Sequence, residues 1–179
     1  MQKKLIILDR DGVINHDSDA YRKSVQEWTP IKGSLQAIAL LNKNGYQIAI
    51  ATNQSGIGRD YYDLDTLNAM HQKMESLLLP LGGHISHIEF CPHIPSDNCI
   101  CRKPKAGMLQ NIIKKFSVNP QDAVMIGDTI NDYQAAKNAE TAFVLVKTGK
   151  GTRTLALGQL PEYVPVYANL AAYVKQLLK

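Results

Sequence analysis

The chain has 179 residues, 45% of them hydrophobic, so it is long enough for one domain over residues 1–179 with a sizeable core. Its formal net charge of +4 comes from scattered lysines and arginines, which argues against nucleic acid as a partner, and no apolar run is long enough to span a membrane. Because Met1 is followed almost at once by a predicted strand, without room for a signal peptide, we expect a cytoplasmic protein that handles small anions.

Short apolar runs alternate with amphipathic segments along most of the chain. The runs that predict strands cover residues 5–8, 46–51, 85–90, 123–126 and 142–146. Amphipathic patterns predict helices over about 34–45, 63–78, 107–116, 129–139 and 168–178, the first with Ser34 as its N-cap. This alternation predicts an α/β fold with a doubly wound, mostly parallel sheet. Residues 12–30 lack periodicity, and we expect them to form an irregular flap.

Two acidic residues follow the first predicted strand. Asp9 and Asp11 are two positions apart, so their side chains point to the same side if the strand continues, and Gly12 then releases the chain into a loop. Ligands of open α/β sheets bind at the carboxyl ends of the strands, and two adjacent carboxylates are disfavoured unless a cation or a proton separates them. Taken alone, this pattern fits either a ligand site or a polar strand end.

Polar residues also follow other predicted strands, at the same edge of the sheet. They are Thr52 and Asn53 after the second strand and Asp128 after the fourth, with Lys103 in a loop nearby. Asp9 and Asp128 are suited to hold Mg²⁺, and Asp9 would then attack phosphorus. Asp11 would protonate the leaving alcohol, while Thr52 and Lys103 would stabilise the phosphoryl oxygens. The collection therefore predicts a phosphoryl-transfer site.

Four motifs in this order resemble the haloacid dehalogenase superfamily of phosphohydrolases. They are Leu8-Asp9-Arg10-Asp11-Gly12-Val13, Ala51-Thr52-Asn53, Arg102-Lys103-Pro104, and Ile126-Gly127-Asp128 with Asn131-Asp132. The resemblance implies that Asp9 is a nucleophile forming a phospho-aspartyl intermediate. It also implies that Asp11 is the acid/base group with its backbone carbonyl on Mg²⁺, and that Asp128 is a metal ligand. Asp132 is either an acid behind the ligands or a residue favoured near a helix N-terminus.

Two further stretches narrow the resemblance to a group of heptose bisphosphate and histidinol-phosphate phosphatases. They are Thr52-Asn53-Gln54-Ser55-Gly56-Ile57, and Cys91-Pro92-His93 followed by Cys99-Ile100-Cys101. The likeness covers residues 5 to about 150 and implies a Rossmann-like fold without a large cap domain. It implies removal of the 7-phosphate of a heptose bisphosphate in lipopolysaccharide precursor synthesis, with histidinol phosphate as the alternative substrate. The implied substrate contacts are Asp17, Ser18, Asp19, Tyr21, Thr52, Asn53, Gln54, Ser55, Arg102 and Lys103. For the flap residues among these, a solvated polar loop is the alternative.

The pattern Cys91-x-His93-x5-Cys99-x-Cys101 is suited to a metal ion. Three thiolates and one imidazole within residues 91–101 match the four ligands of a closed, structural Zn²⁺ site. The C-x-H and C-x-C spacings are tighter than in zinc knuckles, so free cysteines with an unrelated histidine are the alternative. A loop with little apolar content would depend on the metal for its shape, and the metal would then position Arg102 and Lys103.

A non-catalytic phosphosugar-binding domain on the same scaffold is the alternative from another functional class. The intact Asp9 and Asp11 pair, together with Lys103 and Asp128, argues against it. We expect a monomer whose partner is a small sugar phosphate. The other histidines lack ligand partners at suitable spacing, and we expect them to lie on the surface or pack in the core: His16, His71, His84 and His87.

Overall fold

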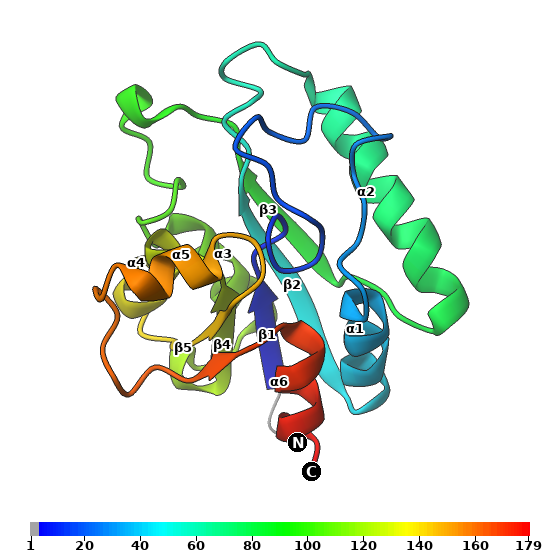
Figure 1. Ribbon diagram of the computed structural model, residues 1–179, viewed down its shortest axis with the longest axis vertical. Coiled ribbons are helices and arrows are strands. Elements are labelled where there is room, and N and C mark those ends of the chain that lie inside the picture. Colours follow the sequence, from blue (N-terminus) through cyan, green and yellow to red (C-terminus); the bar gives the residue numbers. More distant parts are fainter. Residues whose placement is uncertain (1–3) are drawn as a thin grey trace.

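A computed structural model of the protein describes residues 4–179. Its sheet has six strands in the order β3-β2-β1-β4-β5-β6, and all neighbouring strands pair in parallel (Figure 1). The strands are β1 (Lys4–Leu8), β2 (Tyr46–Asn53), β3 (His87–Cys91), β4 (Ala123–Gly127), β5 (Ala142–Val146) and β6 (Val166–Tyr167). The helices are α1 (Ser34–Lys43), α2 (Leu64–Leu78), α3 (Gly107–Phe116), α4 (Ile130–Asn138), α5 (Gly151–Ala156) and α6 (Leu170–Leu177). Single 3-10 turns cover Leu79–Leu81, Pro95–Asp97 and Pro120–Asp122. The predicted doubly wound α/β fold is confirmed.

Apolar side chains cover both faces of the sheet, which explains the continuous apolar runs of the sequence. Ile6 and Leu8 of β1 pack in one core with α1, α2 and α6, whereas Leu5 and Ile7 pack in a second core with α3 and α4. Successive residues of a strand face opposite sides, so one strand supplies both cores. Within the described residues, no helix combines the length and apolar character needed to cross a lipid bilayer.

Three local features differ from the sequence-based expectation. Ser34 is not the N-cap of α1, because Gly33 occupies that position with φ 86°. The Ser34 hydroxyl instead lies 2.6 Å and 2.7 Å from the carbonyl oxygens of Ile14 and Ile31, so it holds the base of the flap. The strand β6 and the helix α5 were not predicted, since two residues and six residues are too short to show a hydrophobic period.

The flap of residues 12–30 is anchored to α2 beside the carboxyl ends of the strands (Figure 1). The Trp28 side chain is fully buried in the core. The ammonium of Lys73 on α2 donates hydrogen bonds to the carbonyl oxygens of Val25, at 2.8 Å, and Trp28, at 2.6 Å. This lysine therefore binds the flap backbone where no secondary structure holds it.

Replacing Lys73 by Met keeps the aliphatic stem but removes both hydrogen bonds to the flap. Hydrogen bonds to a charged donor are worth about 1.5–3 kcal/mol, so local opening of residues 23–31 is expected to become at least about tenfold more frequent. Amide hydrogen exchange measures this opening. Lys43→Met is the matched control, because Lys43 is exposed at the end of α1. Equal flap exchange in both variants would contradict the anchoring role.

Candidate active site

The acidic residues of the sequence motifs meet where the chain order of the sheet reverses. The chain leaves β1 for β2 on one side and returns through β4 on the other side of β1. Such a switch point leaves a crevice at the carboxyl ends of the strands. Asp9 follows β1, Asp128 follows β4, and oxygens of Asp9, Asp128 and Asp132 lie within 4.8 Å of one another. These residues line a cavity of about 240 Å³.

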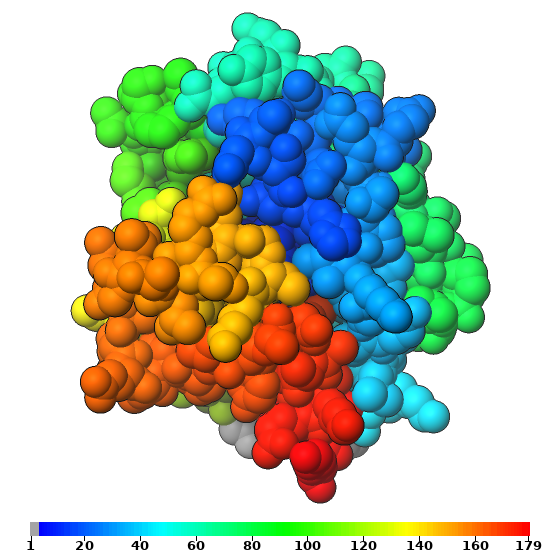
Figure 2. All heavy atoms as spheres, in the orientation of Figure 1, coloured from blue at the N-terminus to red at the C-terminus, as the bar shows by residue number. Residues whose placement is uncertain are grey.

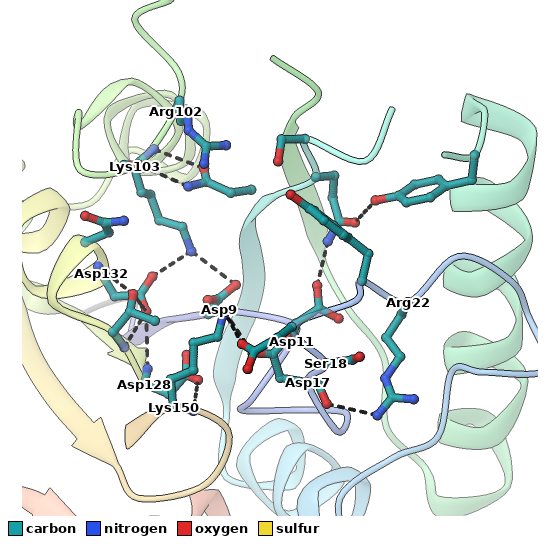
Figure 3. Close-up of a pocket in the computed structure, with 18 residues that line it drawn as sticks. Asp9, Asp11, Asp17, Ser18, Arg22, Arg102, Lys103, Asp128, Asp132 and Lys150 are labelled. Carbon is teal, nitrogen blue, oxygen red and sulfur yellow. Dashed lines mark hydrogen bonds and ion pairs between the residues drawn. The ribbon is translucent and has the colours of Figure 1, made fainter. Parts of the chain in front are cut away.

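Lys103 supplies the positive charge of this acidic cluster. Its Nζ lies 3.1 Å from Asp9 Oδ1 and 2.7 Å from Asp132 Oδ1, and its side chain is 2% exposed (Figure 3). Although burial lowers the pKa of Lys103, the carboxylates of Asp132 and Asp9 raise it above its usual value of 10.5. The lysine is therefore a permanent cation. Asp132, whose role the sequence left open, pairs with it.

Asn53 holds the backbone of Lys103 in place. Its Nδ2 donates to the Lys103 carbonyl oxygen at 3.0 Å, and its Oδ1 accepts from the Lys103 amide at 3.0 Å. The lysine side chain in turn donates to the carbonyl oxygen of Ala51 at 2.8 Å. The amide that sequence reasoning assigned to substrate contact is thus used to attach the Lys103 segment to β2.

Asp9 and Asp128 lack enough positive charge around them. Burial, opposed by Lys103, raises the pKa of Asp9 from 3.8 to about 7. Burial and the nearby carboxylates of Asp132 and Asp9 raise the pKa of Asp128 well above 3.8. Asp128 Oδ2 accepts from the backbone amide of Lys150 at 2.7 Å, but its buried Oδ1 has no hydrogen-bond partner within residues 4–179. A bare carboxylate oxygen beside a second acid fits a hard divalent cation such as Mg²⁺.

Gly12 allows the loop after β1 to approach Asp128. It has a φ of 88°, which side-chain-bearing residues rarely adopt, and a Cβ at this position would collide with Asp128 Oδ2. The hydroxyl of Thr148, in the loop after β5, donates to the Gly12 carbonyl oxygen at 2.6 Å. The glycine of the first motif therefore allows two loops to close around one carboxylate.

Asp11 is held by a buried arginine that sequence reasoning did not single out. Arg10 is fully buried, and its Nη2 lies 3.0 Å from Asp11 Oδ1 and 3.1 Å from Oδ2. Asn15 Nδ2 donates to Asp11 Oδ1 at 2.8 Å. Although burial opposes the shift, Arg10 and these hydrogen bonds hold the pKa of Asp11 below 3.8. Burial and Arg10 also lower the pKa of His71 to about 4, so its neutral ring accepts from Arg10 Nη1 at 3.3 Å.

The predicted substrate contacts divide into two groups. Most of them line the cavity: Asp17, Ser18, Asp19, Tyr21, Asn53, Gln54, Ser55, Arg102 and Lys103. Thr52 lies behind this surface at 1% exposure, and its Oγ1 accepts from Gln54 Nε2 at 2.9 Å. A hydroxyl that accepts one bond still has its own proton to donate.

Lys150 is one of the cavity residues that sequence reasoning missed. Its Nζ lies 3.3 Å from Asp17 Oδ2 and 3.7 Å from Asp19 Oδ1, and Arg153 Nη2 lies 3.3 Å from Asp19 Oδ2. Figure 2 shows the dark blue flap packed against the yellow-orange loop after β5. The segment Thr148-Gly149-Lys150-Gly151 follows a strand that ends at this edge, and that position was the available signal.

The three cysteines and His93 form a compact cluster at the end of β3. Sγ of Cys91 lies 3.6 Å from Sγ of Cys99 and 3.1 Å from Sγ of Cys101, and His93 Nδ1 lies 3.3 Å from Cys101 Sγ. Tetrahedral zinc with Zn–S bonds of about 2.3 Å separates its sulfurs by about 3.8 Å. Burial raises the pKa of Cys99, but hydrogen bonds, chiefly from the Arg102 amide, outweigh it and lower this pKa to about 6. The cluster is compatible with a four-ligand metal site.

Comparisons with known proteins agree over the whole chain. Residues 6–140 match the family model of the haloacid dehalogenase-like hydrolases. A D-glycero-beta-D-manno-heptose-1,7-bisphosphate 7-phosphatase from Pseudomonas putida is 50% identical over 175 residues, covering 98% of this chain and 99% of that protein. Its counterpart from Pseudomonas aeruginosa is 49% identical over the full length of both chains. The crystal structure of D,D-heptose 1,7-bisphosphate phosphatase from B. bronchiseptica, complexed with magnesium and phosphate, has a TM-score of 0.96, with 50% identity and 98% coverage of both chains.

The raised pKa values predict how Mg²⁺ and pH act together on stability. Folding raises the pKa of Asp9 from 3.8 to about 7, so the stability contributed by its protonation is complete below pH 3.8 and is lost as the pH rises through about 7. Folding also raises the pKa of Asp128, so its protonation likewise contributes stability at low pH that is lost as the pH rises. Since Mg²⁺ needs both carboxylates ionised, its stabilising effect on the melting temperature should be larger at about pH 8 than at about pH 5.

Thermal denaturation with and without Mg²⁺ at the two pH values measures this difference. A ligand at about a hundredfold its Kd adds about 2.7 kcal/mol of stability. Asp128→Asn is the control variant, and it should lose most of the Mg²⁺ response at both pH values. An equal response of the unaltered protein at both pH values would contradict a site that is formed by these two acids.

Proposed function

Because this chain belongs to the haloacid dehalogenase-like hydrolases, we propose that it is an Mg²⁺-dependent phosphatase that removes the 7-phosphate of D-glycero-D-manno-heptose 1,7-bisphosphate. The observation that carries the substrate is the full-length similarity to phosphatases named for it, at 49–50% identity. Their names specify the beta anomer, which is the expected substrate here. The reaction belongs to the supply of activated heptose for lipopolysaccharide. The expected monomeric state and cytoplasmic location stay predictions.

Asp9 is the proposed nucleophile. Its Oδ1 accepts from the Arg10 amide at 2.7 Å and lies 3.1 Å from Lys103 Nζ, so the carboxylate is held at one oxygen. Oδ2 carries no hydrogen bond from residues 4–179. Attack by Asp9 on the phosphorus breaks the bond from phosphorus to the C7 oxygen and forms a phospho-aspartate. Lys103 offsets the negative charge on the phosphoryl oxygens during this step.

Asp11 is the proposed acid and base. It gives its proton to the departing C7 oxygen, and then takes a proton from the water that attacks the phospho-aspartate, which releases phosphate and restores Asp9. Arg10 favours the ionised form of Asp11 in the free protein. A doubly negative phosphate monoester beside it favours the protonated form, because like charges disfavour ionisation. Substrate binding therefore favours the protonated form of Asp11, which the first step requires.

Asp9, Asp128 and the backbone carbonyl of Asp11 are the proposed ligands of Mg²⁺. The orphaned Oδ1 of Asp128 and the raised pKa values of Asp9 and Asp128 support this assignment. When bound, the ion supplies positive charge that reduces the repulsion between the Asp9 carboxylate and the phosphate. Arg102, Ser55 and the flap residues Asp17 and Tyr21 line the cavity and are proposed to contact the sugar bisphosphate.

A structural Zn²⁺ ion is proposed for Cys91, His93, Cys99 and Cys101. The short sulfur–sulfur and sulfur–nitrogen distances support it. Arg102 directly follows the last ligand, and its Nη1 donates to the His93 carbonyl oxygen at 3.2 Å. Zinc would therefore orient this arginine toward the substrate without touching the reacting atoms.

Replacing Asp9 by Asn tests the nucleophile and the substrate together. Phosphate release from the heptose bisphosphate with Mg²⁺ should fall by at least about 10³-fold, because the amide is a far weaker nucleophile. The melting temperature of the variant should not fall, since Lys103 keeps its ion pair with Asp132 while one of several clustered buried acids is removed. Histidinol phosphate is the comparison substrate. The substrate assignment fails if the unaltered protein hydrolyses histidinol phosphate well and leaves the bisphosphate intact.

Removing zinc with a strong chelator should loosen the loop of residues 91–102 before the sheet melts. Without the metal, few apolar contacts hold this loop, so its amide hydrogen exchange should accelerate by about tenfold or more, while exchange in β1 and β4 stays unchanged. The strands serve as the internal control. Unchanged protection of the loop in metal-depleted protein, verified by metal analysis, would count against a structural ion.

A further inference from the structure

Gln54 is fully engaged by protein groups. It is 3% exposed, and its Nε2 donates to Asp11 Oδ2 at 2.8 Å and to Thr52 Oγ1 at 2.9 Å. Its Oε1 accepts from Arg10 Nη2 at 3.2 Å and from the Tyr62 hydroxyl at 2.5 Å. A primary amide has two N–H donors, and both are in use. Gln54 therefore has no donor left for the substrate, although it lines the cavity.

The neighbours of Gln54 define which way its amide faces. Arg10 is a donor only and requires the oxygen, whereas an ionised Asp11 is an acceptor only and requires the N–H groups. The reversed amide would set N–H against N–H and oxygen against oxygen. Tyr62 adds the shortest bond on the oxygen side, and burial raises its pKa to about 12, so the phenol keeps the proton that it donates.

The loop after β2 folds back to bring Tyr62 to Gln54. The Ile57 amide donates to the Gln54 carbonyl oxygen at 3.2 Å, and the Tyr61 amide donates to the Gly56 carbonyl oxygen at 2.9 Å. A Cβ at Gly56 would collide with the Tyr62 ring, so the glycine allows the ring to lie against the turn. Tyr62 is 9% exposed in this position.

We propose that Tyr62 is a positioning residue for Asp11, acting through the Gln54 amide. This rests on the proposed function, in which Asp11 protonates the leaving oxygen. Gln54 is one of two groups that hold Asp11 Oδ2, the other being Arg10 Nη2 at 3.1 Å. Without the Tyr62 hydroxyl, the amide gains rotational freedom, and the Asp11 carboxyl loses its fixed direction toward the leaving group. Tyr62 itself does not touch the reacting atoms.

Tyr62→Phe, compared on two classes of substrate, tests this role. An alkyl phosphate such as the heptose bisphosphate needs a proton on its departing oxygen, whereas p-nitrophenyl phosphate releases a stable anion without one. General acid catalysis contributes about 10²–10⁴-fold, so partial misorientation should lower kcat/KM for the alkyl phosphate by about tenfold and for the aryl phosphate by less than about twofold. The KM for the alkyl phosphate should stay nearly unchanged, and thermal denaturation verifies that the variant is folded.

Two further variants make the test specific. Tyr61→Phe is the matched control, because the Tyr61 side chain is 52% exposed and its hydroxyl has no hydrogen bond to residues 4–179; its rates should equal those of the unaltered protein. Gln54→Met removes the amide, and adding Tyr62→Phe to it should change the alkyl-to-aryl ratio no further. Equal losses on both substrates, or an undiminished second effect in the double variant, would overturn the proposal.

The test separates this proposal from the proposed function. Any alkyl phosphate that the unaltered protein hydrolyses serves for the comparison, so a wrong substrate assignment leaves the alkyl-to-aryl ratio measurable. Asp11→Asn supplies the reference for complete loss of the acid. If that variant shows no preference for the aryl phosphate, Asp11 is not the acid, and the proposed role of Tyr62 is then wrong as well.

Discussion

The buried ammonium of Lys103 is the interaction on which the site depends. Asp9, Asp128 and Asp132 converge at the end of two adjacent strands, where burial raises the pKa of Asp9 and of Asp128. Lys103 pairs with two of the three and is itself tied to β2. Removing Lys103 would leave both of its buried partners uncompensated, and breaking a buried ion pair in this way costs about 3–5 kcal/mol. The remaining acid, Asp128, has a buried oxygen without a hydrogen-bond partner in residues 4–179, and a divalent cation would complete the balance.

Loops, and not a separate domain, surround this charged centre. The flap contributes Asp17 and Tyr21, the loop after β5 contributes Lys150, and the Cys/His loop contributes Arg102. Each is anchored by its own contacts: the flap by the lysine on α2, the loop after β5 by its amide on Asp128, and the Cys/His loop by its four clustered side chains. The rigid sheet therefore carries the chemistry, while independently anchored loops shape the space for the sugar.

The sequence predicted the convergence of Asp9 and Asp128, because parallel strands present their carboxyl ends at one edge. It did not predict the surroundings of these acids. Arg10 was overlooked since an arginine between two aspartates is expected to face solvent, and only tertiary packing reveals that it is buried against His71. Tyr62 and Lys150 reach the site through turns whose path depends on side-chain contacts. Strands and long helices can be predicted from the period of hydrophobic residues in the sequence. The side-chain contacts that fix these turns produce no such period.

The double hydrogen bond between Asn53 and Lys103 has a consequence for how this protein could diversify. The Asn53 side-chain amide bonds to both backbone groups of Lys103, as a paired peptide group of a neighbouring strand would. The lysine is therefore held by β2, although it belongs to a different segment of the chain. Arg102, one residue earlier, depends on the Cys/His loop instead. Insertions, deletions or substitutions in that loop can therefore change the reach of the arginine without displacing Lys103. Selection for a new phosphate ester would then act on one exchangeable segment while the hydrolytic chemistry is inherited intact.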